Sequence, residues 1–155
     1  MKNINRVIFA AGSGTARAPM AAAIMENMAK GQELEVLARG IVVQFPEPLN
    51  QKAEAVLISN GLFLDGYSSR QISDEDITDT TIIFTMEETW RLHIIEDLEN
   101  ANEENTFVLS SFVGDELEIL NPYGAPLQSY GLCFEVIKKS VEKCLLRLQE
   151  EKEGE

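Results

Sequence analysis

The chain has 155 residues, of which 45% are hydrophobic, and its 26 acidic side chains outnumber its 13 lysines and arginines to leave a net charge of −13. This composition predicts one globular domain over residues 1–150, followed by an acidic tail at 151–155 that we expect to be disordered. The negative charge argues against binding to nucleic acid or to anionic membranes, because both need clustered cations on the protein.

Two further absences in the sequence bear on location. The apolar run at the N-terminus, 7–11, is too short for a secretory signal. No stretch approaches the roughly 20 apolar residues of a membrane-spanning helix. We therefore expect a cytoplasmic protein.

Hydrophobic patterning divides the chain into alternating strand-like and helix-like segments. Apolar or alternating runs predict strands at 6–11, 33–39, 80–85 and 106–110. Helices are predicted at 19–30, at 50–60 with Asn50 as the N-cap, at 87–100, and at 130–148, where apolar residues recur every three or four positions. A capping box that begins at Ser73 predicts one short helical turn.

This alternation predicts an α/β fold, with a four-stranded parallel sheet flanked by helices on both faces. Sheets of this kind bind their ligands at the carboxyl ends of the strands. The turn that follows the first strand, at 11–19, is therefore the first place to look for a site.

That turn has the features of an anion-binding loop. Its glycines tolerate the positive φ angles that bring successive backbone N–H groups to one point, and the start of the next helix adds positive potential. The planar guanidinium of Arg17 is able to hold two oxygens of an oxyanion. The candidate phosphate-binding residues are Gly12, Ser13, Gly14, Thr15, Ala16 and Arg17.

Other interpretations of the loop are weaker. No Lys-Ser/Thr pair follows it, so it is not a Walker loop, and it lacks the third glycine of a dinucleotide-binding turn. The remaining alternative is a tight strand-to-helix connection in which Arg17 is incidental.

No cofactor is expected. The two cysteines, Cys133 and Cys144, lie in one predicted helix roughly 16 Å apart, which is too far for a disulfide. With one histidine and no CxxC pair, a zinc site is not expected either. The acidic residues at 74–79 are explained as the start of a helical turn rather than as metal ligands.

The segment VIFAAGSGTARAPMA (7–21) resembles the signature of the low-molecular-weight protein-tyrosine phosphatases, a strand followed by C-x5-R-S-P-M-A. The resemblance extends over nearly the whole chain, in the family's order and spacing, through GYSSRQI (66–72), IFTM (83–86), FVG (112–114) and NPYG (121–124). It points to the bacterial tyrosine and arginine phosphatases. It implies a fold like that of phosphotyrosine protein phosphatase I and a loop that binds phosphate.

The resemblance also implies that the catalytic groups are replaced. Ala11 stands at the position of the cysteine nucleophile, and Asn121 at that of the aspartic acid that protonates the leaving group. Ala18 stands where a serine donates to the thiolate. Loss of a nucleophile costs on the order of 10⁶ in rate, so we expect no catalysis of the family's type.

Supporting residues of the loop differ as well. Gly14 and Tyr67 stand where the family has an asparagine and a histidine that brace the loop, so we expect a looser loop. Ala16 replaces a second loop cysteine, whereas Arg17 and the pocket wall Tyr123 remain. So many changes indicate natural divergence; the alternative is an engineered substrate trap, which alters one or two positions.

No other group takes the nucleophile's place in the sequence. Ser13 and Thr15 lie in the loop without a neighbouring base. His93, the one histidine, belongs to the helix predicted at 87–100, where we expect a packed or surface residue.

Three functions stay open at this point. The favoured one is a pseudophosphatase that binds phosphate, a phosphorylated protein or a small oxyanion. The second is a working phosphatase: Thr15 resembles the arginine enzymes, whereas Tyr123 resembles the tyrosine enzymes. The third is a vestigial site on a scaffold whose acidic surface, C-terminal helix or loop at 45–48 binds a protein partner.

Overall fold

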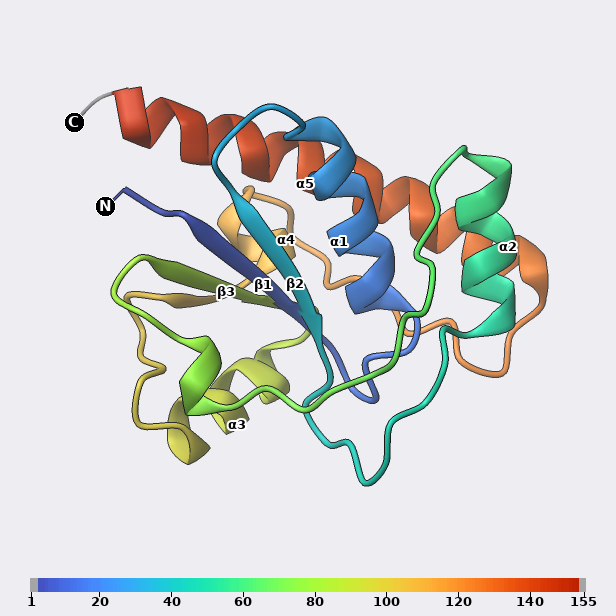
Figure 1. Cartoon of the computed structure of the whole chain (residues 1–155), viewed down its shortest axis with the longest axis horizontal. Helices are drawn as coiled ribbons and strands as arrows, with labels where there is room; N and C mark the ends of the chain where they lie inside the picture. The colour runs from blue at the N-terminus through green and yellow to red at the C-terminus, as the bar shows by residue number, and fades with distance from the viewer. Residues whose placement is uncertain (1–2, 154–155) are drawn as a thin grey trace.

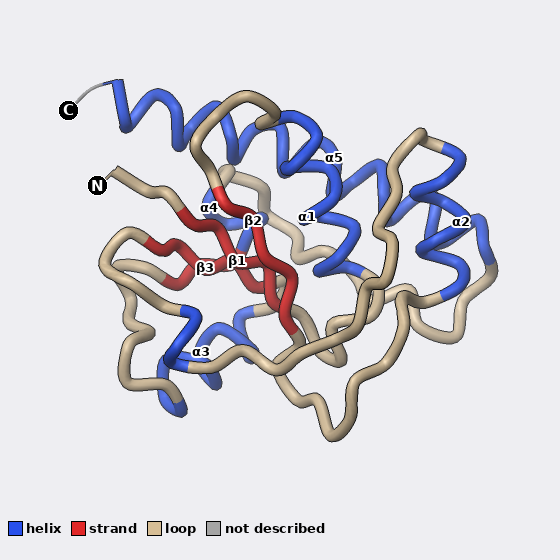
Figure 2. Tube along the Cα trace, in the orientation of Figure 1, coloured by secondary structure: helices blue, strands red, loops and turns tan. Residues whose placement is uncertain are grey.

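A computed structural model describes residues 3–153 and has the predicted α/β architecture (Figure 1). Within those residues the four strands form one parallel sheet, in the order β2-β1-β3-β4 (red in Figure 2). The strands are β1 (Arg6–Ala10), β2 (Glu35–Arg39), β3 (Thr81–Thr85) and β4 (Thr106–Val108). All of them lie inside the segments predicted as strands.

The central strands are apolar at 7–10 and 82–84 because both of their faces are covered there. Val7 and Phe9 belong to the larger core cluster, whereas Ile8 and Ala10 belong to a separate cluster on the opposite face. The larger cluster is covered by α1 (Arg17–Met28), α2 (Gln51–Ser59), α4 (Leu109–Phe112) and α5 (Leu127–Glu153). The smaller one is covered by α3 (Glu88–Asp97) and the 3₁₀ turn η1 (Asp74–Asp76) (Figure 1).

Both local helix signals are confirmed. The side chain of Asn50 accepts the N–H groups of Lys52 and Ala53 and so caps α2. Ser73 and Asp76 form the predicted capping box of η1. Each signal depends on neighbours within one turn, which is why the sequence alone reveals it.

Several helix boundaries differ from prediction. α1 begins at Arg17 rather than at Pro19, and this is tolerated because the first turn of a helix has no intrahelical use for the missing proline N–H. The fourth strand ends at Val108, and residues 109–110 start α4, which was not predicted. α5 extends to Glu153, so residues 151–153 of the expected tail are helical, and 154–155 lie outside the described residues.

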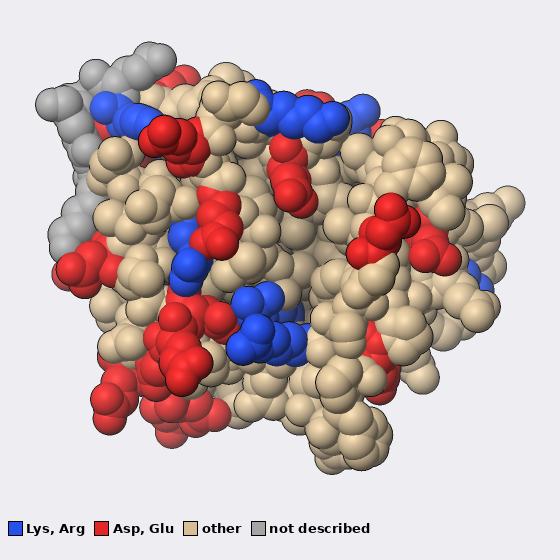
Figure 3. Space-filling view, in the orientation of Figure 1, with Lys and Arg blue, Asp and Glu red and all other residues tan. Residues whose placement is uncertain are grey.

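The charged side chains on the face of the molecule visible in Figure 3 are mainly acidic. Figure 3 shows acidic side chains gathered over the region of η1 and α3, with lysine and arginine in small separate groups. Among residues 3–153, no helix combines the length and hydropathy needed to cross a bilayer.

Candidate functional site

The loop that joins β1 to α1 lies at the carboxyl end of the central strands, as predicted. Ala11 is buried at its base. Gly12 and Gly14 have φ angles of +22° and +74°. Gly14 also packs tightly against Gly40 at the end of β2: a Cβ added to Gly14 would lie 2.7 Å from the Gly40 nitrogen. Gly14 is therefore required both by its backbone angle and by the close approach of Gly40.

Three carbonyl groups of the loop accept hydrogen bonds from residues in other segments of the chain. The Gly12 carbonyl accepts the N–H of Ile41 at 2.7 Å, and the Thr15 carbonyl accepts that of Asn50 at 2.9 Å. The Gly14 carbonyl accepts the Tyr67 hydroxyl at 2.5 Å. In a trans peptide the next N–H points away from the carbonyl, so these bonds aim the N–H groups that follow toward the inside of the loop.

The loop's N–H groups are largely available to a ligand. Among residues 3–153, no protein acceptor takes the N–H of Gly12, Ser13, Thr15, Ala16 or Arg17. The Gly14 N–H differs, because it donates to the Ala11 carbonyl at 2.7 Å. Free N–H groups in a concave loop at a helix N-terminus form a nest for an anion.

Arg17 is buried, and protein groups hold its guanidinium. Nη1 donates to the Ile119 carbonyl at 2.7 Å, and Nη2 forms an ion pair with Glu87 Oε1 at 2.8 Å. Arg17 thereby ties the start of α1 to the segments that follow β3 and α4. The remaining N–H donors of the guanidinium are not used by these two bonds.

Tyr67 supports the loop, which corrects the expectation that its replacement of a histidine leaves the loop unbraced. Its hydroxyl donates to the Gly14 carbonyl from a position far along the chain. Burial raises the pKa of Tyr67 to about 12, against the opposing effect of the Arg39 charge. The hydroxyl therefore keeps its proton, and its donor role, throughout the neutral range.

A small cavity of about 50 Å³ lies inside the loop. Its walls are formed by Ala11 and the six candidate phosphate-binding residues, together with Asn50, Asn121, Tyr123 and Tyr130. The predicted pocket residues Asn121 and Tyr123 are thus brought to the loop, and the Asn121 side chain accepts the Tyr123 N–H at 3.1 Å. The sequence predicts Asn50 as a helix cap and Tyr130 as part of the terminal helix's apolar face. Their place at the cavity comes from tertiary packing, which has no local signal.

The remaining hydroxyl, imidazole and thiol groups considered for catalysis each have contacts of their own. Ser13 Oγ and Thr15 Oγ1 lie 2.9 Å apart and form a hydrogen bond with each other. His93 pairs with Asp97 on α3, and neither residue lines the loop's cavity. The sulfur of Cys133 lies 3.8 Å from the Leu120 carbonyl, and this residue does not line the loop's cavity. Burial raises the pKa of Cys133 to about 11, so its thiol stays protonated at neutral pH.

In the part of the chain that the structure describes, no group of three or more histidine, cysteine and acidic side chains is placed to hold a metal ion.

Comparisons with known proteins agree on one family. The family model described as low molecular weight phosphotyrosine protein phosphatase matches residues 6–154. A protein-arginine-phosphatase of Geobacillus stearothermophilus is 28% identical over 147 residues, covering 94% of this chain and 97% of that protein.

Solved structures give the same result. The YwlE arginine phosphatase from Geobacillus stearothermophilus superposes with a TM-score of 0.84 at 27% identity, covering 96% of this chain and 95% of that one. A low molecular weight protein tyrosine phosphatase from T. tengcongensis superposes with a TM-score of 0.86 at 24% identity, covering 92% and 99%. The chain belongs to the low molecular weight phosphotyrosine protein phosphatase family.

Proposed function

We propose that this protein is a catalytically inactive member of the family that has kept the phosphate-binding loop. The observation that carries the proposal is the loop itself, in which external bonds hold the carbonyl groups while N–H groups remain free around a cavity with the Ala11 methyl group at its base. Such a cavity provides positive charge and hydrogen-bond donors to a bound anion, but it contains no nucleophile.

The absence of catalysis follows from Ala11 and Asn121. A methyl group cannot attack phosphorus, and an amide has no proton to give to a leaving group at neutral pH. Cys133 does not substitute, because its sulfur lies 3.8 Å from the Leu120 carbonyl and its raised pKa keeps the thiol protonated.

Binding of phosphate is supported by the same substitution. In an active enzyme of this type the thiolate and the phosphate dianion repel each other at contact. At an effective dielectric constant near 20, two unit charges about 4 Å apart interact by roughly 4 kcal/mol. Ala11 removes that repulsion and leaves the free N–H groups and the helix N-terminus.

The ion pair between Arg17 and Glu87 opposes binding, because the Glu87 carboxylate offsets part of the positive charge that a phosphate would meet. Glu87 is partly exposed, so water screens its charge more than it screens the buried guanidinium. We infer that the unused donors of Arg17 face the ligand while Glu87 and Ile119 fix the orientation of the guanidinium.

The proposed ligand is a phosphorylated protein side chain or a small oxyanion. An active phosphatase on phosphotyrosine or phosphoarginine is the second candidate, favoured by the named activities of the relatives and by Thr15, which resembles the arginine enzymes. A cytoplasmic location stays a prediction from the sequence.

Turnover separates the two candidates. We expect the purified protein to hydrolyse phosphotyrosine and phosphoarginine peptides no faster than its Arg17→Ala variant does, when free phosphate is measured. Ala11→Cys alone should restore little activity, because Ala18 does not stabilise a thiolate and Asn121 does not protonate a leaving group. Hydrolysis by the unaltered protein that Arg17→Ala abolishes would establish the active phosphatase instead.

A further inference from the structure

An apolar groove of about 1000 Å³ lies beside the loop, between the segment that follows α4 and the first turns of α5. Leu117 and Leu120 project from the segment with exposed fractions of 83% and 84%, and Leu132 and Val136 project from α5 with 70% and 50%. Single exposed leucines are ordinary, but four large aliphatic side chains that line one hollow form a contiguous apolar patch.

These side chains contribute little to the core of the domain. Leu132 and Val136 are four positions apart and therefore lie on one face of α5. The residues of α5 that pack into the core, such as Phe134, Ile137 and Val141, are fully or almost fully buried. The exposed pair is therefore available to a partner without disturbing the fold.

The charge around the groove is negative. Glu116 and Glu118 line it, and among the described residues that form its walls there is no lysine or arginine. Glu118 is held in place because its Oε2 accepts the Glu88 N–H at 2.6 Å. An occupant with apolar side chains and neighbouring positive charges would match both the walls and the rim.

The groove and the loop's cavity adjoin each other. Asn121 lines both of them, and Arg17 of the loop donates to Ile119, which lines the groove. An extended peptide advances about 3.3–3.6 Å per residue, so a ligand held in the loop would reach the groove within a few residues.

We propose that the groove binds the segment next to the phosphorylated residue of a protein ligand, and that it selects an apolar side chain accompanied by lysine or arginine. This inference rests on the proposed function, because the phosphorylated residue must sit in the loop. The groove supplies the sequence preference, whereas the loop supplies affinity for the phosphate.

The test uses the full chain and two separate probes, followed by methyl and amide shifts. One probe is inorganic phosphate, and the other is a short unphosphorylated peptide that contains leucine and arginine. We expect phosphate to shift residues 12–17 and the peptide to shift the methyl signals of Leu117, Leu120, Leu132 and Val136. Replacing the peptide's arginines with glutamates should abolish its binding.

Matched variants on α5 make the test specific. Leu132→Glu should weaken peptide binding by about tenfold, as expected for the loss of one buried leucine contact, and should leave the phosphate affinity unchanged. Leu146→Glu changes another exposed leucine of the same helix, outside the groove. It should change neither the affinity for the peptide nor the affinity for phosphate.

The results that would contradict this inference differ from those that would contradict the proposed function. Phosphate binding without peptide binding, or equal effects of both variants on peptide binding, shows that the groove is not a peptide site. The proposed function is unaffected by this result. Peptide binding without phosphate binding shows that the proposed function fails and that the groove serves no phosphorylated ligand. A dimer that Leu132→Glu dissociates identifies a second copy of the chain as the occupant.

Discussion

Tyr67 holds the anion-binding loop through a single hydrogen bond. We expect Tyr67→Phe to lower the free energy of unfolding by about 1 kcal/mol, because the Gly14 carbonyl loses its partner. Phosphate affinity should also fall by a factor of about 2–5, because the loop then has to be ordered on binding. Urea denaturation and phosphate titration measure the two effects.

Tyr123→Phe is the matched control for this change. The Tyr123 side chain is 84% exposed, so loss of its hydroxyl should leave the stability unchanged. A Tyr67→Phe variant as stable as Tyr123→Phe would show that the bond to Gly14 does not brace the loop.

Gly14 combines a positive φ angle with a close backbone contact, and the two constraints on a side chain at this position are separable. Gly14→Ala should cost about 2–5 kcal/mol, because a side chain is disfavoured at its positive φ and would collide with the backbone of Gly40. Gly66→Ala has a similar φ of +69° but open space around the added carbon, so it should cost only about 1–2 kcal/mol. Equal shifts of the two denaturation midpoints would mean that Gly40 yields to the added carbon.

At the scale of single residues, the sequence predicts what depends on near neighbours. The two loop glycines and Arg17 stand within six positions of one another, so their common role is visible as a pattern. The partners that fix them are remote: Tyr67 lies 53 positions from Gly14, and Glu87 lies 70 positions from Arg17. Their roles follow from the folded sheet and carry no local signal.

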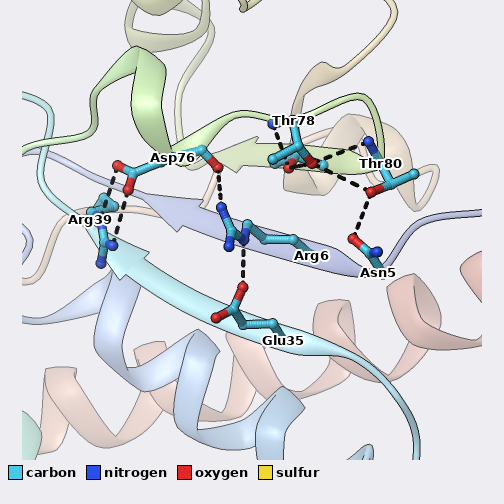
Figure 4. A network of polar contacts seen from close by, with 8 residues as sticks. Asn5, Arg6, Glu35, Arg39, Asp76, Thr78 and Thr80 are labelled. Carbon is cyan, nitrogen blue, oxygen red and sulfur yellow. Dashed lines mark hydrogen bonds and ion pairs between the residues drawn. The ribbon is translucent and has the colours of Figure 1, made fainter.

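At the scale of elements, β2 is joined to η1 by the ion pair of Arg39 and Asp76 (Figure 4). Arg39 Nε and Nη2 donate to the two carboxylate oxygens at 3.1 and 3.2 Å. Burial alone would raise the pKa of Asp76, but the hydrogen bonds from Arg39 and from the Ser73 N–H outweigh it and hold the pKa below its usual range. Arg6 adds a bond to the Asp76 carbonyl at 2.8 Å, so the turn is tied to two strands.

This pair predicts a loss of stability in acid. A carboxylate whose pKa is lowered by folding contributes stability at pH values above its unfolded pKa, and that contribution disappears as the pH falls through the folded-state pKa. Asp76→Asn should therefore be less stable than the unaltered protein at pH 7, and the difference should shrink below about pH 4. Asp65→Asn, at an exposed position, is the control for thermal melts across this range. A difference that stays constant down to strong acid would rule out the ion pair as its source.

The order of the elements was predictable, and their ends were less so. Apolar residues at 7–10 and 82–84 identify β1 and β3 because both faces of these strands are buried. The sequence did not predict α4 because its four residues are too few to show a helical period, and the first two of them fall in the segment 106–110 that is predicted as one strand. The groove was not predicted either, because it forms between two segments that the sequence does not show to be adjacent.

At the scale of the whole molecule, the proposed anion site lies in a strongly acidic chain. The net charge of −13 repels anions in general. At physiological ionic strength, charges farther than about 8–10 Å from the site are largely screened, so the N–H groups and Arg17 dominate at contact. The same acidity favours a ligand that carries positive charge beside its phosphate, in keeping with the carboxylates of the groove.

The central claim is that the loop binds phosphate in the absence of a nucleophile, and a phosphate titration of this chain, followed by amide shifts, tests it most directly. We predict saturable shifts of residues 12–17 at about millimolar phosphate, weakened by Arg17→Ala. Amide signals of residues 12–17 that stay unchanged up to high phosphate concentration would contradict the claim.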